Sequence, residues 1–346
     1  MIEFGDCRET MRRWAEQGVK AQTCVTSPPY YGLRDYGHDG QIGLEETPDE
    51  YIKAMVEVFR CVWDVLEDDG TLWLNIGDSY AMASMRGENS VFSGGVGAHA
   101  GYKTGSVKLG KRSIPFGLKP KDLIGIPWML AFALRADGWY LRQDIIWHKP
   151  NPMPESVQDR CTKAHEYIFL LSKSQKYYYD ADAIAEPVTD STAIRLLQDI
   201  DNQRGSDRVP NKTNGTMKAV GGKKFTSDMG GGGTTFVGHS GYTKADGTSS
   251  LKATRNKRSV WTVTTKPYSG AHFATFPPDL IEPCILAGAP VGGVVLDPFM
   301  GSGTTAAVAI LNGRNYLGCE LNPGYKELQD IRIRDAHLET AQMELI

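Results

Sequence analysis

The feature that most restricts the fold of this 346-residue chain is a short apolar run that passes directly into a glycine-rich turn. Residues 294–297 read VVLD, the turn that follows reads PFMGSG, and the next segment, TTAAVAILNG, favours a helix capped by Gly313. A strand, a glycine turn and a helix in this order are typical of α/β proteins with a parallel sheet. Such a turn exposes backbone N–H groups and brings the main chain close to a ligand. We therefore expect a binding site where this strand ends.

Other short apolar runs alternate with amphipathic helices along the chain. We expect about seven strands, among them residues 2–4, 21–26, 70–78, 140–147, 166–171, 294–297 and 315–320. One helical face carries Met55, Phe59, Val62 and Leu66. The sequence SKSQ is expected to turn residues 166–171 back into KYYYD as a hairpin. This pattern predicts an α/β fold with a mainly parallel sheet covered on both sides.

Composition is that of an ordinary folded protein, because 41% of the residues are hydrophobic and 23% are charged. No apolar run reaches the roughly 18 residues of a membrane span, and the N-terminal MIEFGDCRET lacks the apolar stretch of a signal peptide. We therefore expect a cytoplasmic protein with no membrane partner. The six cysteines show no CxxC spacing, so neither a disulfide framework nor a metal site is expected.

Two basic, glycine-rich stretches stand out against the net charge of -3. Residues 91–121 carry six basic and no acidic side chains, while residues 190–260 carry twelve basic and six acidic ones. The second stretch ends in the cluster Arg255, Lys257 and Arg258. Their glycine content predicts flexible loops that close on a ligand. Basic stretches on an otherwise acidic chain favour binding to the phosphate backbone of a nucleic acid. The alternative is that both stretches are ordinary solvated loops, which have the same composition.

The glycine turn itself indicates a nucleoside cofactor without identifying which one. Gly301, Gly303 and Ala306 satisfy the GxGxxG/A spacing, and Glu320 lies 17 positions after Gly303 at the end of another expected strand. A carboxylate there can accept both hydroxyls of a ribose. The alternative is a purely structural turn of an α/β protein.

The tetrapeptide Ser27-Pro28-Pro29-Tyr30 follows an apolar strand near the N-terminal end. Two prolines fix the backbone and remove two N–H donors, so we expect the carbonyls and the Ser27 hydroxyl to point outward as a rim rich in acceptors. Such a rim suits the exocyclic amine of a base, and Tyr30 offers a flat face for stacking. Catalysis of this kind needs neither a nucleophilic side chain nor a metal, only orientation and electrostatic stabilisation. The alternative is a Pro-Pro turn with a buried tyrosine.

Four segments together, TSPPYYG, IIWHKPNPMPE, DPFMGSGTT and YLGCELNP, resemble the amino-group DNA methyltransferases that use S-adenosylmethionine. The order of the motifs is similar to that of the beta group, which implies a circularly permuted, Rossmann-like sheet. The resemblance implies three regions along the chain. These are a catalytic half at 1–174 with a flexible basic loop at 84–117, a target-recognition region at 175–262, and a cofactor-binding half at 263–346.

The resemblance also assigns roles to individual residues. The residues assigned to the cofactor are Asp6, Thr275, Phe276, Asp297, Phe299, Gly301, Gly303, Thr304 and Glu320. Thr275 and Phe276 lie in HFATFP, which departs from the commoner threonine-glutamine-lysine-proline form of the family. The catalytic residues are Ser27, Pro28, Pro29 and Tyr30. The residues expected to contact the substrate are Trp147, which could equally be an ordinary core tryptophan, and the basic cluster Arg255, Lys257 and Arg258.

The function expected from these observations is methylation of double-stranded DNA at a specific site, with cytosine N4 favoured over adenine N6. Serine in place of aspartate in the tetrapeptide is commoner in family members that methylate cytosine N4. A cognate restriction endonuclease would be a separate protein, because the chain carries no nuclease motif. The alternatives are a nicotinamide-dependent (NAD) oxidoreductase and a non-catalytic nucleic-acid-binding protein. Cys284, in DLIEPCILAG, is expected to be a core residue of a helix and not a nucleophile.

Overall fold

The computed structural model describes residues 1–33, 37–38, 40–81, 114, 117–189, 241–243, 249–251, 254–265 and 276–343. The chain divides into a main unit, Met1–Ala183 with Arg258–Ile346, and a smaller unit, Ile184–Lys257. Most of the loop expected at 84–117 lies outside the described residues. No helix in the described part of the chain has the length and apolar character of a membrane span.

The main unit is built on one eight-stranded sheet with the order β1-β12-β11-β2-β3-β5-β4-β10. The strands are β1 (Ile2–Phe4), β2 (Ala21–Thr26), β3 (Leu66–Ile76), β4 (Tyr140–His148), β5 (His165–Ser172), β10 (Val260–Thr262), β11 (Val294–Asp297) and β12 (Asn315–Glu320). Neighbouring strands run parallel except where β5 pairs with β3 and with β4. The predicted mainly parallel α/β sheet is confirmed. The short edge strand β10 is one more than the sequence pattern indicated.

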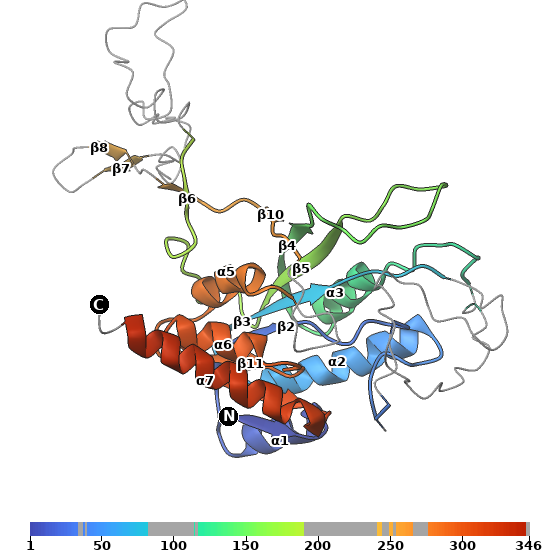
Figure 1. Cartoon of the computed structure of the whole chain (residues 1–346), viewed down its shortest axis with the longest axis horizontal. Helices are drawn as coiled ribbons and strands as arrows, with labels where there is room; N and C mark the ends of the chain where they lie inside the picture. Colours follow the sequence, from blue (N-terminus) through green and yellow to red (C-terminus); the bar gives the residue numbers. More distant parts are fainter. Residues whose placement is uncertain are drawn as a thin grey trace, which may run out of the picture. The chain divides into compact units, whose positions relative to one another are not determined.

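Helices lie on both sides of this sheet (Figure 1). They are α1 (Cys7–Glu16), α2 (Pro48–Val65), α3 (Ile126–Ala136), α5 (Pro278–Gly288), α6 (Thr304–Leu311) and α7 (Lys326–Met343), with the 3-10 turn η1 (Pro323–Tyr325) before α7. α2 packs against α1 and α3, whereas α6 packs against α5 and α7. α2 starts at a capping box, in which Thr47 and Glu50 satisfy each other's backbone N–H groups.

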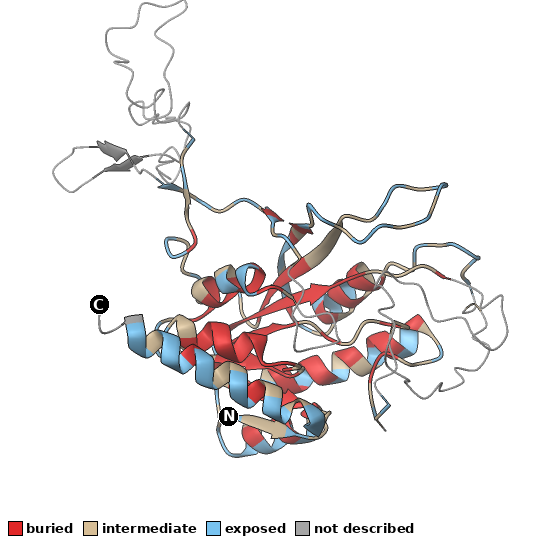
Figure 2. Ribbon diagram, in the orientation of Figure 1, coloured by how far each residue is buried: buried red, intermediate tan, exposed pale blue. Residues whose placement is uncertain are grey.

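The core forms where the sheet meets the inner faces of these helices, as the buried residues in Figure 2 show. Met55, Phe59 and Val62 are fully buried on α2, as their helical spacing predicts, and Leu66 is buried where β3 begins. Cys284 is also buried within α5, which agrees with its interpretation as a core residue.

The smaller unit contains two short antiparallel pairs in its described part. β6 (Glu186–Pro187) pairs with β9 (Thr254–Arg255), and β7 (Gly241–Thr243) pairs with β8 (Ser249–Leu251). Arg255 lies opposite Glu186 and forms an ion pair with it at 3.5 Å. This unit therefore interrupts the main unit between β5 and β10.

The predicted hairpin from residues 166–171 into KYYYD is wrong. The segment after β5 is held by other contacts: Tyr178 N donates to Asp69 O at 2.9 Å, and Asp180 N donates to Ala287 O at 2.9 Å. The ring of Tyr179 stacks on Trp73 with 6.2 Å between centroids. Since β5 already has β3 and β4 as neighbours, it has no open edge for a third strand.

Gly288 provides a test of the packing between α5 and the sheet. A Cβ atom at this position would lie 2.6 Å from Thr23 Oγ1 and 2.8 Å from Trp73 Nε1, both in the buried interior. We expect Gly288→Ala to lower the free energy of unfolding by about 1–3 kcal/mol through overpacking. Urea denaturation measures the effect, with the exposed Glu282→Ala of the same helix as control. Equal denaturation midpoints for the wild type and Gly288→Ala would contradict the packing described.

Candidate functional site

The tetrapeptide and the glycine turn follow the carboxyl ends of two neighbouring strands in the middle of the sheet, β2 and β11. β2 and β11 are parallel neighbours, with Thr23 opposite Val295 and Cys24 opposite Leu296, so their carboxyl ends lie side by side. From there β2 continues through α2 to β3 on one side, and β11 continues through α6 to β12 on the other. This is a topological switch point, the place where open α/β sheets bind ligands.

A buried carboxylate joins the two strand ends. Asp297 Oδ1 accepts hydrogen bonds from Thr26 Oγ1 at 2.6 Å and from Phe299 N at 3.0 Å, and Oδ2 accepts one from Thr305 Oγ1 at 2.6 Å. Burial raises the pKa of Asp297 to about 6, although these hydrogen bonds act in the opposite direction. Asp297 therefore fastens the end of β2, the glycine turn and the first turn of α6 together.

The glycine turn has the backbone conformation that its sequence predicts. Gly301 and Gly303 have φ of 53° and 84°, in the left-handed region that favours glycine. Gly301 N donates to Glu320 Oε2 at 2.7 Å, and Asn322 N donates to Glu320 Oε1 at 2.8 Å. Burial raises the pKa of Glu320. The carboxylate of Glu320 thus lies directly against the turn, as its place at the end of the neighbouring strand β12 suggests.

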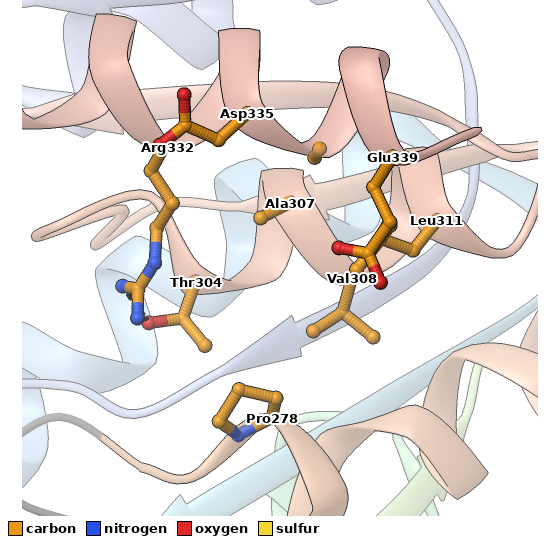
Figure 3. A pocket seen from close by; sticks show the side chains of 9 residues that line it. Pro278, Thr304, Ala307, Val308, Leu311, Arg332, Asp335 and Glu339 are labelled. Atoms are coloured by element: carbon orange, nitrogen blue, oxygen red, sulfur yellow. Dashed lines mark hydrogen bonds between the residues drawn. The ribbon is translucent and has the colours of Figure 1, made fainter. Parts of the chain in front are cut away.

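α7 supports the same turn through side chains that the sequence analysis missed. Gln329 is 1% exposed and donates from Nε2 to Gly301 O at 2.7 Å. Arg332 donates to Ser302 Oγ and to Thr304 Oγ1, both at 2.7 Å. Figure 3 shows Arg332 reaching from α7 to Thr304. The two residues line a cleft of about 200 Å³ that α6, α7 and Pro278 at the start of α5 enclose. No motif marks these residues, because their partners are backbone and hydroxyl oxygens nearly 30 positions away.

Asp6 lies on the same side of the sheet, just beyond the carboxyl end of β1. β1 pairs with β12, Phe4 lies opposite Glu320, and Gly5 N donates to Glu320 O at 2.9 Å. The carboxylate of Asp6 caps α1 by accepting from Arg8 N at 2.8 Å, and it also pairs with the Arg8 guanidinium. The hydrogen bond from the Arg8 side chain lowers the pKa of Asp6. Predicted site residues therefore lie at, or just after, the ends of four adjacent strands, β1, β12, β11 and β2.

Contacts beyond the prolines fix the tetrapeptide. The hydroxyl of the fully buried Tyr51 donates to Pro29 O at 2.9 Å, and Gly32 N donates to Gly43 O at 2.8 Å. The Pro29 carbonyl therefore accepts a bond from the protein itself, in contrast to the expectation that the carbonyls of this segment point outward. Pro28 is buried and Ser27 is half-buried.

Tyr30 is held at both its tip and its edge. Its hydroxyl donates to Glu166 Oε2 at 2.9 Å. A Cβ atom at Gly77 would lie 2.7 Å from Cε2 of the ring, so the ring approaches the backbone of Gly77 closely. Burial, followed by the nearby charge of Glu166, raises the pKa of Tyr30 well above its usual value. The phenol is therefore neutral and acts as a donor.

The remaining predicted residues lie in varied surroundings. Trp147 is 4% exposed, its indole N–H donates to Val263 O at 2.8 Å, and Lys149 Nζ lies 4.1 Å from the ring centroid. Phe276 is half-buried just before α5, and Thr275 lies outside the described residues. The basic cluster is split, because Arg255 and Lys257 belong to the smaller unit and the exposed Arg258 to the main unit.

Comparison with known proteins gives matches along nearly the whole chain. The model of a family described as DNA methylase, N6_N4_Mtase, matches residues 21–330. The chain is 43% identical to the Type II methyltransferase M.SmaI of Serratia marcescens over 335 residues, covering 96% of this chain and 90% of that protein. It is 42% identical to the Type II methyltransferase M.Cfr9I of Citrobacter freundii over 336 residues, covering 95% and 86%.

Solved structures share the fold at low sequence identity. The cytosine-N4-specific PvuII DNA methyltransferase superposes with a TM-score of 0.54 at 16% identity, covering 98% of this chain and 91% of that one. A putative DNA modification methylase from Thermus thermophilus, complexed with S-adenosyl-L-methionine, superposes with a TM-score of 0.52 at 20% identity, covering 97% and 95%.

The raised pKa of Asp297 makes stability depend on pH. The protonated form is favoured in the folded state, because the pKa rises from 3.8 to about 6 on folding. The contribution of Asp297 is therefore most favourable below pH 3.8 and is lost as the pH rises through about 6. Relative to Asp297→Asn, which does not titrate, we expect the wild type to lose about 3 kcal/mol of unfolding free energy across this range. Urea denaturation at a series of pH values measures the unfolding free energy of both proteins. If this free energy changes with pH by the same amount in the wild type and in Asp297→Asn, the raised pKa of Asp297 is contradicted.

The bond from Gln329 to the glycine turn gives a second prediction. We expect Gln329→Met, which keeps the volume but removes the donor, to speed amide hydrogen exchange at residues 301–304. We also expect it to weaken binding of S-adenosyl-L-methionine about 5- to 10-fold, the equivalent of one hydrogen bond of about 1 kcal/mol. Hydrogen-exchange mass spectrometry and calorimetry measure the two effects. Gln17→Met, at the end of α1, serves as control, and unchanged exchange at the turn would contradict the role of Gln329.

Proposed function

The chain belongs to the N6/N4 DNA methylase family, and on that premise we propose that it methylates the exocyclic amine of a flipped base, with cytosine N4 as the target. It is a DNA methyltransferase that uses S-adenosyl-L-methionine. Family membership removes the nicotinamide-dependent oxidoreductase and the non-catalytic binding protein as alternatives. The target atom and the roles of individual residues are the parts that we propose.

One observation carries the proposal: the hydrogen bond of 2.6 Å from Thr26 to Asp297 holds the strand before the tetrapeptide against the strand before the glycine turn. A methyl donor on the turn and a base at the tetrapeptide would then share one crevice. Transfer between two bound groups requires their reacting atoms to be held about 3–3.5 Å apart, which a rigid edge of this kind supports.

The donor groups at the strand ends fit the cofactor. Glu320 places a carboxylate with remaining acceptor capacity beside the N–H groups of the turn, which suits ribose hydroxyls. We propose that the cofactor contacts are made by Asp6, Thr275, Phe276, Asp297, Phe299, Gly301, Gly303, Thr304 and Glu320. Asp297 is buried and already accepts three hydrogen bonds from the protein, so its main part is to shape the turn. When bound, the cofactor supplies a methyl group on a sulfonium, which is electrophilic.

The tetrapeptide is proposed to orient the acceptor amine. Its members in this role are Ser27, Pro28, Pro29 and Tyr30. In this proposal the Ser27 hydroxyl and the Pro28 carbonyl accept the two amine hydrogens, which directs the nitrogen lone pair toward the methyl group. Pro29 contributes by its fixed backbone, because its carbonyl is bonded to Tyr51. Tyr30 is proposed to stack on the base, and Trp147 to lie beside that base.

Cytosine N4 is favoured on two grounds. The tetrapeptide begins with serine, which is the form commoner among cytosine-N4 enzymes of the resembling family. A solved structure of similar fold is described as cytosine-N4-specific.

The order of the motifs, with the tetrapeptide before the glycine turn, favours the beta group of the family.

The partner is proposed to be double-stranded DNA, read by the region between the two halves of the methyltransferase domain. The separate unit Ile184–Lys257 falls within the 175–262 region expected to recognise the target. Halves at 1–174 and 263–346 flank it. Arg255, Lys257 and Arg258 are proposed to contact phosphates, and a cognate endonuclease is proposed to be a separate protein, as the Type II names of the relatives suggest.

Labelled S-adenosyl-L-methionine incubated with unmethylated genomic DNA tests the proposal. We expect label in N4-methylcytosine after digestion to nucleosides. Tyr30→Ala should slow methylation roughly 10- to 100-fold through lost base stacking while leaving cofactor affinity unchanged. Tyr140→Ala, an exposed tyrosine at the start of β4, is the matched control.

The position of the label separates the outcomes. Label in N6-methyladenine would overturn the target atom but keep the amine chemistry, whereas label on cytosine C5, or none, would overturn the proposed reaction. Equal loss of turnover and of cofactor affinity in Tyr30→Ala would remove Tyr30 from its stacking role.

A further inference from the structure

A chain of side chains connects the tetrapeptide tyrosine to β4 and β5. We propose that Glu166 and Lys149 are positioning residues, which hold the ring of Tyr30 in the orientation that stacks on the extruded base. The inference rests on the proposed function, since that function gives Tyr30 its stacking role. Neither residue belongs to the set that the sequence analysis assigned to the site.

The first link is the bond between Tyr30 and Glu166. The hydroxyl donates to Glu166 Oε2 at 2.9 Å and the ring edge lies against Gly77, so the ring is held at two points. A carboxylate acceptor makes this a charge-assisted hydrogen bond, which is stronger than a neutral one. A phenylalanine would offer the same face for stacking, so the distinct contribution of the tyrosine hydroxyl is to fix the ring.

The second link keeps the carboxylate of Glu166 in place. Lys149 forms an ion pair with Glu166, and the two side chains are only 17% and 16% exposed. Removing one partner of such a shielded ion pair would leave the other charge without compensation, so Lys149 holds the carboxylate of Glu166 in place. Asn75 adds a bond from Nδ2 to Tyr167 O at 3.1 Å, which holds β3 against β5 beside Glu166.

The third link orders Lys149 itself. Its ammonium lies 4.1 Å from the centroid of the Trp147 ring, a cation–π contact, and its backbone N donates to Ala164 O at 2.8 Å. Trp147 is in turn bonded to Val263 O, just beyond β10. The ring of Tyr30 is thus tied to the rigid sheet through Glu166, Lys149 and Trp147 in succession.

A double-mutant cycle on the full chain tests this role. The variants are Glu166→Ala, Tyr30→Phe and the pair combined, with Glu166→Gln as the conservative variant that keeps an oxygen acceptor. Asp137→Asn is the control, because it removes the charge that pairs with Arg60 at the end of α3. The readouts are the single-turnover rate of methyl transfer to unmethylated genomic DNA, the affinity for S-adenosyl-L-methionine, and the far-ultraviolet circular dichroism spectrum.

We expect Glu166→Ala and Tyr30→Phe each to slow methyl transfer roughly 10- to 100-fold, the scale of a 1 Å misplacement, with cofactor affinity and spectrum unchanged. The double variant should be no slower than the slower single variant. Glu166→Gln should fall between Glu166→Ala and the wild type, because it keeps an oxygen acceptor for the Tyr30 hydroxyl but loses the ion pair with Lys149. Additive losses in the double variant, or wild-type rates in Tyr30→Phe, would overturn the positioning role. If Glu166→Ala fails to fold, Tyr30→Phe and Glu166→Gln decide the question. A wild type that labels no exocyclic amine would instead overturn the proposed function.

Discussion

The buried carboxylate of Asp297 is the contact on which the arrangement of the site depends. It accepts hydrogen bonds from Thr26 at the end of β2 and from Thr305 in the first turn of α6. Thr26 and Asp297 are 271 positions apart in the sequence, yet the parallel pairing of β2 with β11 places them side by side. Because the tetrapeptide begins one residue after Thr26 and the glycine turn begins after Asp297, this contact fixes both.

Side chains of neighbouring helices and strands hold the two binding segments in place through hydrogen bonds. Gln329 and Arg332 of α7 hold the glycine turn, while Tyr51 of α2 and Glu166 of β5 hold the tetrapeptide. The proposed reaction uses no nucleophilic side chain of the protein, so orientation and electrostatic stabilisation would supply most of its rate enhancement. Side chains that lock the site residues are then as important as the groups that touch the substrates.

Local signals predicted much of the fold and the site. β11 and β12 have the bounds that the runs VVLD and NYLGCE indicate, because both strands are buried and end at turn residues. The hairpin after β5 was wrong, because the stacking of Tyr179 on Trp73 is a tertiary contact that no local pattern encodes. The roles of Gln329 and Glu166 were missed for the same reason: their partners are Gly301 and Tyr30, far away in the sequence.

We propose that a methyl donor on the glycine turn and a base held by the tetrapeptide meet in one crevice. A crystal structure with S-adenosyl-L-homocysteine and DNA that contains the methylated site tests this directly. We expect an extruded base stacked on Tyr30, with its amine at Ser27 and Pro28 and roughly 3–3.5 Å from the position of the transferred methyl group. A base that stays in the duplex, or a cofactor bound away from Gly301 and Glu320, would contradict it.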